Sequence, residues 1–286
     1  EQEIDKDPFE TLTSDLAPLL SACVWHERHA RRILRTRRPA GRSLWQIGQR
    51  HRVLRTPLGR VAIIATWNYP IQLLGVQLTQ ALVAGNSVVV KPSERTPRSQ
   101  QALLELAREA GAGENRLRWT PPDRAEGAKL LGAETFDHVV FTGSTGVGRE
   151  IAGRLGASLT PSTLELSGQD SALVLEDADC QLAARSLVYA MTLNSGQTCM
   201  APRRAIVHQT IAEAFTEALA REVSGRGSLA LPADEQARCD ALIADAVARG
   251  GRLVRAEHAG ERFAPAIVAG CPLEAPLAEG AHFGPA

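Results

Sequence analysis

Hydrophobic and polar positions follow two different periods along the middle of the chain. Short apolar runs rich in β-branched residues, at 61–65, 87–90 and 138–141, predict buried strands. Apolar residues recur with the period of a helix at 71–83, 99–110 and 147–155, which predicts a helix after each strand. Strands that alternate with helices are typical of an α/β fold built on a doubly wound parallel sheet.

The segments on either side extend this picture. Residues 5–38 have a helical pattern, and we expect Pro18 to kink or divide it. Polar and apolar residues mix loosely over about 43–56, which predicts an exposed strand in an extended arm. Further on, the pattern predicts a strand at 172–175, short strands within 252–268, and three more helices, at 180–193, 211–223 and 234–249.

Composition narrows the possible partners. Lys plus Arg equals Asp plus Glu, at 32 each, which argues against nucleic acid and anionic membranes as partners. The basic run 31–38 is compatible with a nucleic-acid patch, but a solvated helix face explains it better because no aromatic residues interleave. No apolar run approaches the ~20 residues that span a bilayer.

The cysteines and histidines argue against structural cross-links and metals. The five cysteines are an odd number without a C-x-x-C pair, which favours a reducing, cytoplasmic location over a disulfide framework or a zinc site. No histidine spacing is typical of a metal site, so we expect no metal. The chain starts at Glu1 without a visible signal peptide and stops abruptly at Ala286, so we expect a trimmed or partial protein.

A cysteine and a carboxylate are the strongest candidates for catalysis. Cys199 ends the segment Asn-Ser-Gly-Gln-Thr-Cys, directly after an apolar helical run, and Glu165 lies between two leucines in a strand-like segment. A thiol with a separate carboxylate suits covalent catalysis, with a nucleophile and a base that activates water. The alternatives are an inert buried thiol and a carboxylate paired at the edge of the core.

Three polar segments follow the predicted strands. Asn68, in Thr-Trp-Asn-Tyr-Pro, offers amide donors to an oxyanion, or caps the next helix. The segment Lys91-Pro-Ser-Glu94 suits phosphate and ribose contacts, or is a solvated turn. The glycines around Ser144 allow a pyrophosphate to approach a helix N-terminus, although such a pattern also suits any tight turn.

Together these segments resemble the NAD(P)-dependent aldehyde dehydrogenase superfamily, whose motifs read N-x-G-Q-x-C, L-E-L-G-G, W-N-[YF]-P, K-P-S-E and G-S-T-x-V-G. The form T-W-N-Y-P is most similar to the class 3 branch. The resemblance covers about residues 57–285.

The resemblance implies oxidation of an aldehyde to a carboxylic acid with NAD or NADP, through a thioester at Cys199. Asn68 and the Cys199 N–H would hold the oxyanion, and Glu165 would activate water. We expect burial to raise the pKa of Glu165 toward that of a base, and a helix N-terminus after Cys199, or Glu165 through water, to favour its thiolate. The implied cofactor-binding residues are Trp67, Lys91, Ser93, Glu94, Gly143, Ser144, Val147, Gly148 and Leu166.

The resemblance also implies two domains. Residues 1–167 would hold the N-terminal helices, the arm and the NAD(P)-binding domain, and 168–286 part of a catalytic domain. In the full-length protein we expect a homo-oligomer, a dimer, that acts on a small-molecule aldehyde.

The sequence departs from the family at three positions, Ser167, Gln169 and Ala281, the last of which stands where the family has a Glu that holds the nicotinamide ribose. Two alternatives stay open. One is a relative that passes the thioester to coenzyme A, although the retained Glu165 argues against it. The other, which Ser167 and Ala281 support, is a degenerate dinucleotide-binding or interaction module without turnover.

Overall fold

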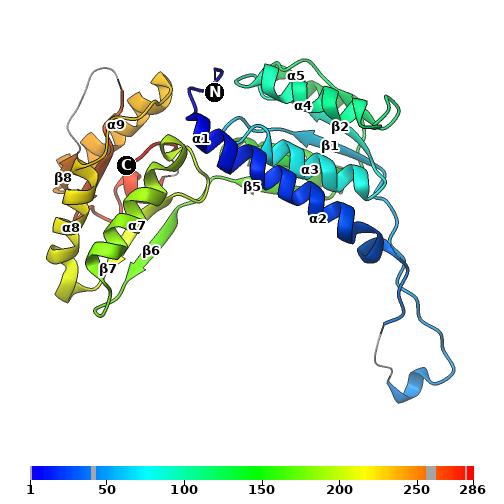
Figure 1. Cartoon of the computed structure of the whole chain (residues 1–286), viewed down its shortest axis with the longest axis horizontal. Helices are drawn as coiled ribbons and strands as arrows, with labels where there is room; N and C mark the ends of the chain where they lie inside the picture. Colours follow the sequence, from blue (N-terminus) through cyan, green and yellow to red (C-terminus); the bar gives the residue numbers. More distant parts are fainter. Residues whose placement is uncertain (1, 40–42, 256–261, 281) are drawn as a thin grey trace. The chain divides into compact units, whose positions relative to one another are not determined.

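The chain forms two compact units, Glu1–Glu165 and Leu166–Ala286 (Figure 1). The structure, a computed structural model, describes residues 2–39, 43–255, 262–280 and 282–286. Ala281, where we expected the loss of a ribose contact, lies outside the described residues.

A five-stranded sheet organises the first unit. Its strands lie in the order β3-β2-β1-β4-β5, with β1 parallel to β2 and β4, and β2 parallel to β3. The central strands are buried on both faces, which explains why their sequences are continuous apolar runs. The bounds are β1 Arg60–Ile64, β2 Ser87–Lys91, β3 Leu117–Trp119, β4 His138–Gly143 and β5 Ser162–Leu166.

Helices connect these strands: α3 Gln72–Val83, α4 Pro97–Glu109, α5 Arg124–Ala133 and α6 Thr145–Ala157. α3 and α4 pack on one face of the sheet through a core that includes Leu74, Leu78 and Leu104. The predicted α/β fold is thus confirmed. The sequence pattern missed β3, which has only three residues, and α5, whose apolar residues do not form a marked stripe.

The N-terminal segment is helical, as predicted, but in pieces. α1 (Pro8–Glu10) leads into a π-helical stretch, Thr11–Leu16, and then α2 (Ala17–Leu34) begins. Pro18 lies in the first turn of α2, where a missing N–H costs nothing, so the division falls before the proline. α2 packs closely on α3, and a Cβ at Gly75 would overlap the side chain of Leu19.

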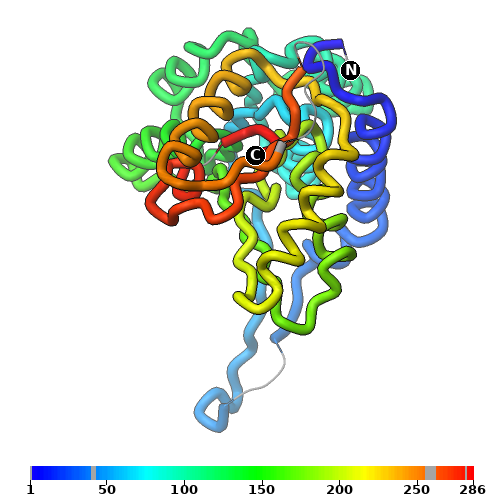
Figure 2. The backbone as a smooth tube through the Cα atoms, turned by 90° about the vertical axis from the view of Figure 1, so that its left-hand side faces the viewer, coloured from blue at the N-terminus to red at the C-terminus, as the bar shows by residue number. Residues whose placement is uncertain are grey.

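The exposed strand predicted at 43–56 is wrong. The described part of this segment contains a 3₁₀ turn at Leu44–Gln46, and its only ladder contact is a single bridge between Arg37 and Val53. The segment extends away from α2 and the sheet (Figures 1 and 2). Leu44, Trp45 and Ile47 are about four-fifths exposed, so no apolar surface fixes the residues into a strand.

The second unit has a smaller α/β core. β6 (Asp170–Val174) pairs in parallel with β7 (Pro202–Val207), and α7 (Cys180–Thr192) and α8 (Ala212–Ser224) pack together around Val188 and Phe215. A second cluster joins α9 (Ala233–Ala248), the antiparallel pair β8 (Arg252–Arg255) and β9 (Ala266–Ala269), and α10 (Pro276–Glu279). β7, interrupted by two arginines, and the short α10 were not predicted. No helix in the described ranges is both long and apolar enough to cross a membrane.

Candidate active site

The three polar loops predicted to bind ligands lie at one edge of the sheet. The last residue pairs of β1, β2 and β4 are in register, with Ile64 opposite both Lys91 and Phe141. The loops that carry Asn68, Glu94 and Ser144 therefore leave the sheet side by side. The carboxyl edge of a doubly wound sheet is where such folds bind ligands.

Asn68 is 2% exposed and its side chain has a fixed direction. The hydroxyl of Thr66 donates to the Asn68 amide oxygen over 3.1 Å, so the amide nitrogen is turned the other way, as a donor to an oxyanion requires. The amides of Ile71, directly before α3, and of Gln72, its first residue, donate to the carboxylate of Asp15. Asp15 therefore provides part of the N-terminal capping of α3, a role that the sequence also allowed for Asn68.

A buried ion pair holds the same loop from the N-terminal segment. Lys6 and Asp15, both with side chains 2% exposed, pair directly. Lys6 Nζ also donates to the Asn68 carbonyl over 3.2 Å and lies 3.9 Å from the centre of the Tyr69 ring. Burial lowers the pKa of Lys6, against the opposing effect of Asp15. The pair thus holds the backbone at Asn68, through Lys6, and directly after the motif at Ile71 and Gln72, through Asp15.

Gln100, which is fully buried in α4, joins two of the loops. Its Nε2 donates to the carbonyls of Thr66 and Pro70, over 2.7 and 3.2 Å, and its Oε1 accepts from the Ser93 amide over 2.7 Å. One side chain therefore sets the spacing between the loops after β1 and β2.

Lys91 and Glu94 form an ion pair of 2.8 Å at the end of β2. Burial raises the pKa of the Glu94 carboxyl, but the hydrogen bonds from Lys91 and from its own amide, with the charges of Lys91 and Arg124, outweigh burial and hold that pKa below its usual 4.5. Ser93, 3% exposed, accepts from the Arg95 amide, and the Arg95 guanidinium stacks 4.6 Å from the centre of the Trp67 ring.

The glycine loop after β4 fits an anionic group. Ser144 caps α6, accepting from the Val147 amide over 3.4 Å. A Cβ at Gly143 would overlap the Phe141 ring, whereas Gly146 faces open space. Gly148 is buried within α6. Free space beside a capped helix N-terminus suits a phosphate.

The desolvation expected at Glu165 is wrong. Glu165 lies in β5, at the edge of the sheet, and is exposed, while Leu166 beside it is half-buried. An edge strand has a neighbour on one side only, so the two flanking leucines do not enclose the carboxylate. Of the other departures from the family, Ser167 is half-buried, and Gln169 has a buried Nε2 without a hydrogen-bond partner.

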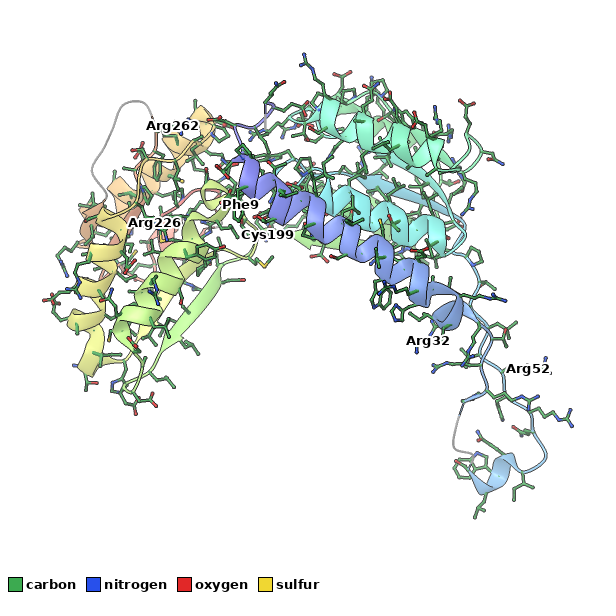
Figure 3. The ribbon with its side chains drawn as sticks, viewed as in Figure 1. Phe9, Arg32, Arg52, Cys199, Arg226 and Arg262 are labelled. Atoms are coloured by element: carbon green, nitrogen blue, oxygen red, sulfur yellow. The ribbon has the colours of Figure 1, made fainter. Side chains whose placement is uncertain are left out.

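Cys199 lies in the second unit, after α7 (Figure 3). We define residues 194–199 as the cysteine loop. Asn194 and Ser195 have φ of 51° and 56°, a left-handed conformation that is costly for residues other than glycine. A Cβ at Gly196, where φ is 76°, would overlap the backbone of Gly284 and Pro285. The loop is therefore held in one specific shape.

The environment of Cys199 corrects one expectation. Cys199 is half-buried, whereas the alternative of an inert thiol expects a fully buried residue. After Cys199 the chain makes a turn at Ala201 and enters β7, so the helix N-terminus expected after the cysteine is wrong.

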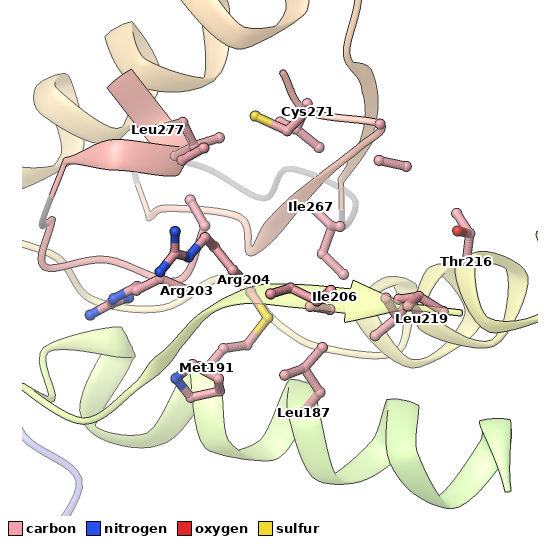
Figure 4. A pocket seen from close by; sticks show the side chains of 18 of the residues that line it. Leu187, Met191, Arg203, Arg204, Ile206, Thr216, Leu219, Ile267, Cys271 and Leu277 are labelled. Carbon is pink, nitrogen blue, oxygen red and sulfur yellow. The ribbon is translucent and has the colours of Figure 1, made fainter. Parts of the chain in front are cut away.

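A cavity of about 350 Å³ opens in the second unit beside β7 (Figure 4). Leu187 and Met191 of α7, Ile206 of β7 and Ile267 of β9 line it, with Arg203 and Arg204 at one end. Its walls are mainly apolar.

Sequence reasoning missed Lys6, Asp15 and Gln100. Of these three residues, only the burial of Gln100 could have been predicted from the sequence. Gln100 precedes Leu104 by four residues and therefore lies on the same, buried face of α4. For Lys6 and Asp15 no local pattern marks burial.

Comparisons with known proteins agree with this geometry. The model of the aldehyde dehydrogenase family matches residues 6–286. The chain belongs to the aldehyde dehydrogenase family. It is 41% identical over 172 residues to geranial dehydrogenase of Castellaniella defragrans, covering 60% of this chain and 36% of that protein. It is 37% identical over 250 residues to vanillin dehydrogenase of Pseudomonas fluorescens, covering 81% and 52%.

Two solved structures that share the fold are an aldehyde dehydrogenase and an NADP-dependent enzyme. The Mycobacterium tuberculosis enzyme complexed with NAD+ has a TM-score of 0.89 at 27% identity, covering 99% of this chain and 61% of that one. An NADP-dependent enzyme of E. coli has a TM-score of 0.87 at 28% identity, covering 99% and 61%. The chain spans about a third to a half of the length of the two curated relatives.

Proposed function

We propose that this chain carries the cofactor-binding region and the nucleophile of an enzyme that oxidises an aldehyde to a carboxylic acid with NAD or NADP. The observation that carries the proposal is the gathering of the Asn68, Lys91–Glu94 and Ser144 loops at one sheet edge. The constrained cysteine loop and the membership of the family support it.

The proposed cofactor contacts divide by chemistry. Lys91 and Glu94 bind ribose hydroxyls, Ser144 and the amides of α6 bind phosphate, and Trp67 gives an apolar contact. Ser93, Gly143, Val147, Gly148 and Leu166 complete the proposed set. The position of the Lys91–Glu94 pair at the end of β2 and the space beside Gly146 support these assignments.

In the proposed reaction the Cys199 thiolate adds to the carbonyl carbon of the aldehyde, and the oxygen takes the negative charge. The Asn68 amide and the Cys199 N–H donate to that oxygen. Bound NAD or NADP supplies the acceptor for the hydride that leaves the same carbon. The carbon is then a thioester on Cys199. Glu165 takes a proton from water, which attacks the thioester and releases the acid and the thiol.

Glu165→Gln tests the proposal in the longest chain that contains these residues. The variant should release one burst of NADH and then stop, because the thioester forms but no base activates water. Cys199→Ala should abolish the burst, and Glu150→Gln, a change at an exposed glutamate of α6, should behave as the parent.

Three results would contradict the proposal. Unchanged turnover in Glu165→Gln would require another base. Turnover that needs coenzyme A would identify an acylating relative. A parent that binds NAD without a burst with any aldehyde would identify the dinucleotide-binding module.

We further propose a homodimer, a cytoplasmic location and the class 3 branch as the place of this chain in its family. The exposed Leu44, Trp45 and Ile47 support self-association, because apolar side chains gathered on one surface favour contact with another protein. All five cysteines are free, which supports a reducing compartment. Light scattering of Trp45→Ser should show the monomer if the arm carries the dimer contact, with Gln49→Ser as the matched control.

A further inference from the structure

Arg203 is a buried cation close to the proposed nucleophile in sequence. It lies in β7, four residues after Cys199, and is 9% exposed. A guanidinium is seldom removed from water unless its donors find acceptors.

The two Nη groups of Arg203 donate to backbone carbonyls, while its buried Nε has no hydrogen-bond partner among the described residues. Nη2 donates to the carbonyls of Gly196 and Thr198, over 2.7 and 3.2 Å, and Nη1 donates to the Gly284 carbonyl over 2.5 Å. One planar group thus binds the loop on both sides of Gln197. It also links the loop to Gly284, whose backbone lies directly against Gly196.

The loop needs such a support. Three successive residues, Asn194, Ser195 and Gly196, have positive φ, and two of them carry side chains. The internal hydrogen bonds at this turn include those from the Gln197 amide to the Asn194 carbonyl and from the Ala201 amide to the Thr198 carbonyl. The hydrogen bonds from the guanidinium therefore stabilise a backbone conformation that these residues disfavour.

Charge adds to this geometry. Burial lowers the pKa of Arg203 to about 10, against the raising effect of Cys239, Asp170, Glu235 and Cys199, so the side chain remains a cation at neutral pH. Arg203 and a thiolate at Cys199 attract each other. Lysine would keep the charge but lacks the planar fork that reaches three carbonyls at once.

We propose that Arg203 is a positioning residue that holds the cysteine loop in the shape that presents Cys199 for attack. The inference rests on the proposed function, and it adds a residue that acts through the loop without touching the substrate.

Two variants separate the fork from the charge. Arg203→Met removes both, and Arg203→Lys keeps only the charge. Arg204→Met is the matched control, because the neighbouring guanidinium donates to the Gln169 carbonyl at 3.4 Å and to no carbonyl of the cysteine loop.

The first measurement is hydrogen exchange of the Gln197 and Ala201 amides. Both Arg203 variants should speed it by at least about tenfold, whereas Arg204→Met should not. Unchanged exchange in α7 and α8 shows that the unit is still folded. The second measurement is timed alkylation by iodoacetamide, with Cys180 of the same sample as reference. Cys199 should react about tenfold more slowly than the parent in Arg203→Met, and more slowly by a smaller factor in Arg203→Lys, which keeps the charge.

The outcomes distinguish the two proposals. A parent in which Cys199 reacts no faster than Cys180 contradicts the proposed function itself. A reactive parent whose loop exchange and alkylation are the same in Arg203→Met overturns the role of Arg203 and leaves the function standing. If Arg203→Met does not fold, Arg203→Lys decides by the loop exchange alone.

Discussion

Replacing Gln100 by Glu tests whether one buried amide holds two motif loops together. The change preserves the shape of the side chain and the acceptor for the Ser93 amide. It replaces the donor with a carboxylate oxygen that faces the carbonyls of Thr66 and Pro70. The carboxylate oxygen and the two carbonyls are all acceptors, so no hydrogen bond forms among them unless the introduced carboxyl is protonated.

The size of the effect follows from proton linkage. Burial and the two carbonyls favour the neutral acid, so the pKa of the introduced carboxyl rises above its usual ~4.3 in the folded state. A rise of about three pH units, typical of a fully buried carboxyl, corresponds to about 4 kcal/mol, at about 1.4 kcal/mol per unit. The folded state then binds more protons than the unfolded state. The loss of stability is therefore small below pH ~4 and grows as pH rises through the folded pKa.

Urea unfolding followed by tryptophan fluorescence measures this loss. All four tryptophans, at 25, 45, 67 and 119, lie in the first unit, so the signal reports that unit. Gln101→Glu is the matched control, since it makes the same change at the exposed neighbour, which bonds only to Glu105 in the described contacts. If both variants lose equal stability at pH 8, or if acid does not reduce the loss in Gln100→Glu, the reasoning is refuted.

Three further predictions concern other buried or paired groups. Lys91→Ala should weaken NAD binding in calorimetry by about 1–3 kcal/mol, and equal affinity would remove this site. Lys6→Met should destabilise the first unit by about 3–5 kcal/mol in the same urea assay, because Asp15 stays buried without its cation. Lys129→Met, which breaks a pair at the surface, is the control, and a smaller loss in Lys6→Met than in this control would contradict the prediction. His282, whose pKa is lowered to about 4 by burial and by Arg203, takes up its proton only on unfolding, so stability should fall by roughly 3 kcal/mol as pH drops from 6.5 to 4. Exchange of the α9 amides should show this slope, and His282→Gln should lack it.

The alternation of apolar periods was sufficient to predict the architecture of the first unit. The strands at 61–65, 87–90 and 138–141 appear as β1, β2 and β4, with a helix after each. Parallel strands place their carboxyl ends on one edge, so the order of motifs along the chain already implied that the Asn68, Glu94 and Ser144 loops lie together. Local sequence carries this information because periodicity is set by burial of one or both faces of an element.

The tertiary structure alone decided which polar groups are buried and what they hold. Lys6 reaches the Asn68 carbonyl across 62 residues, Gln100 reaches Thr66 across 34, and Arg203 reaches Gly284 across 81. It also decided that Glu165 is exposed and that β7 follows Cys199. A polar residue is buried only where distant segments supply its hydrogen-bond partners, and those partners leave no period in the sequence around it.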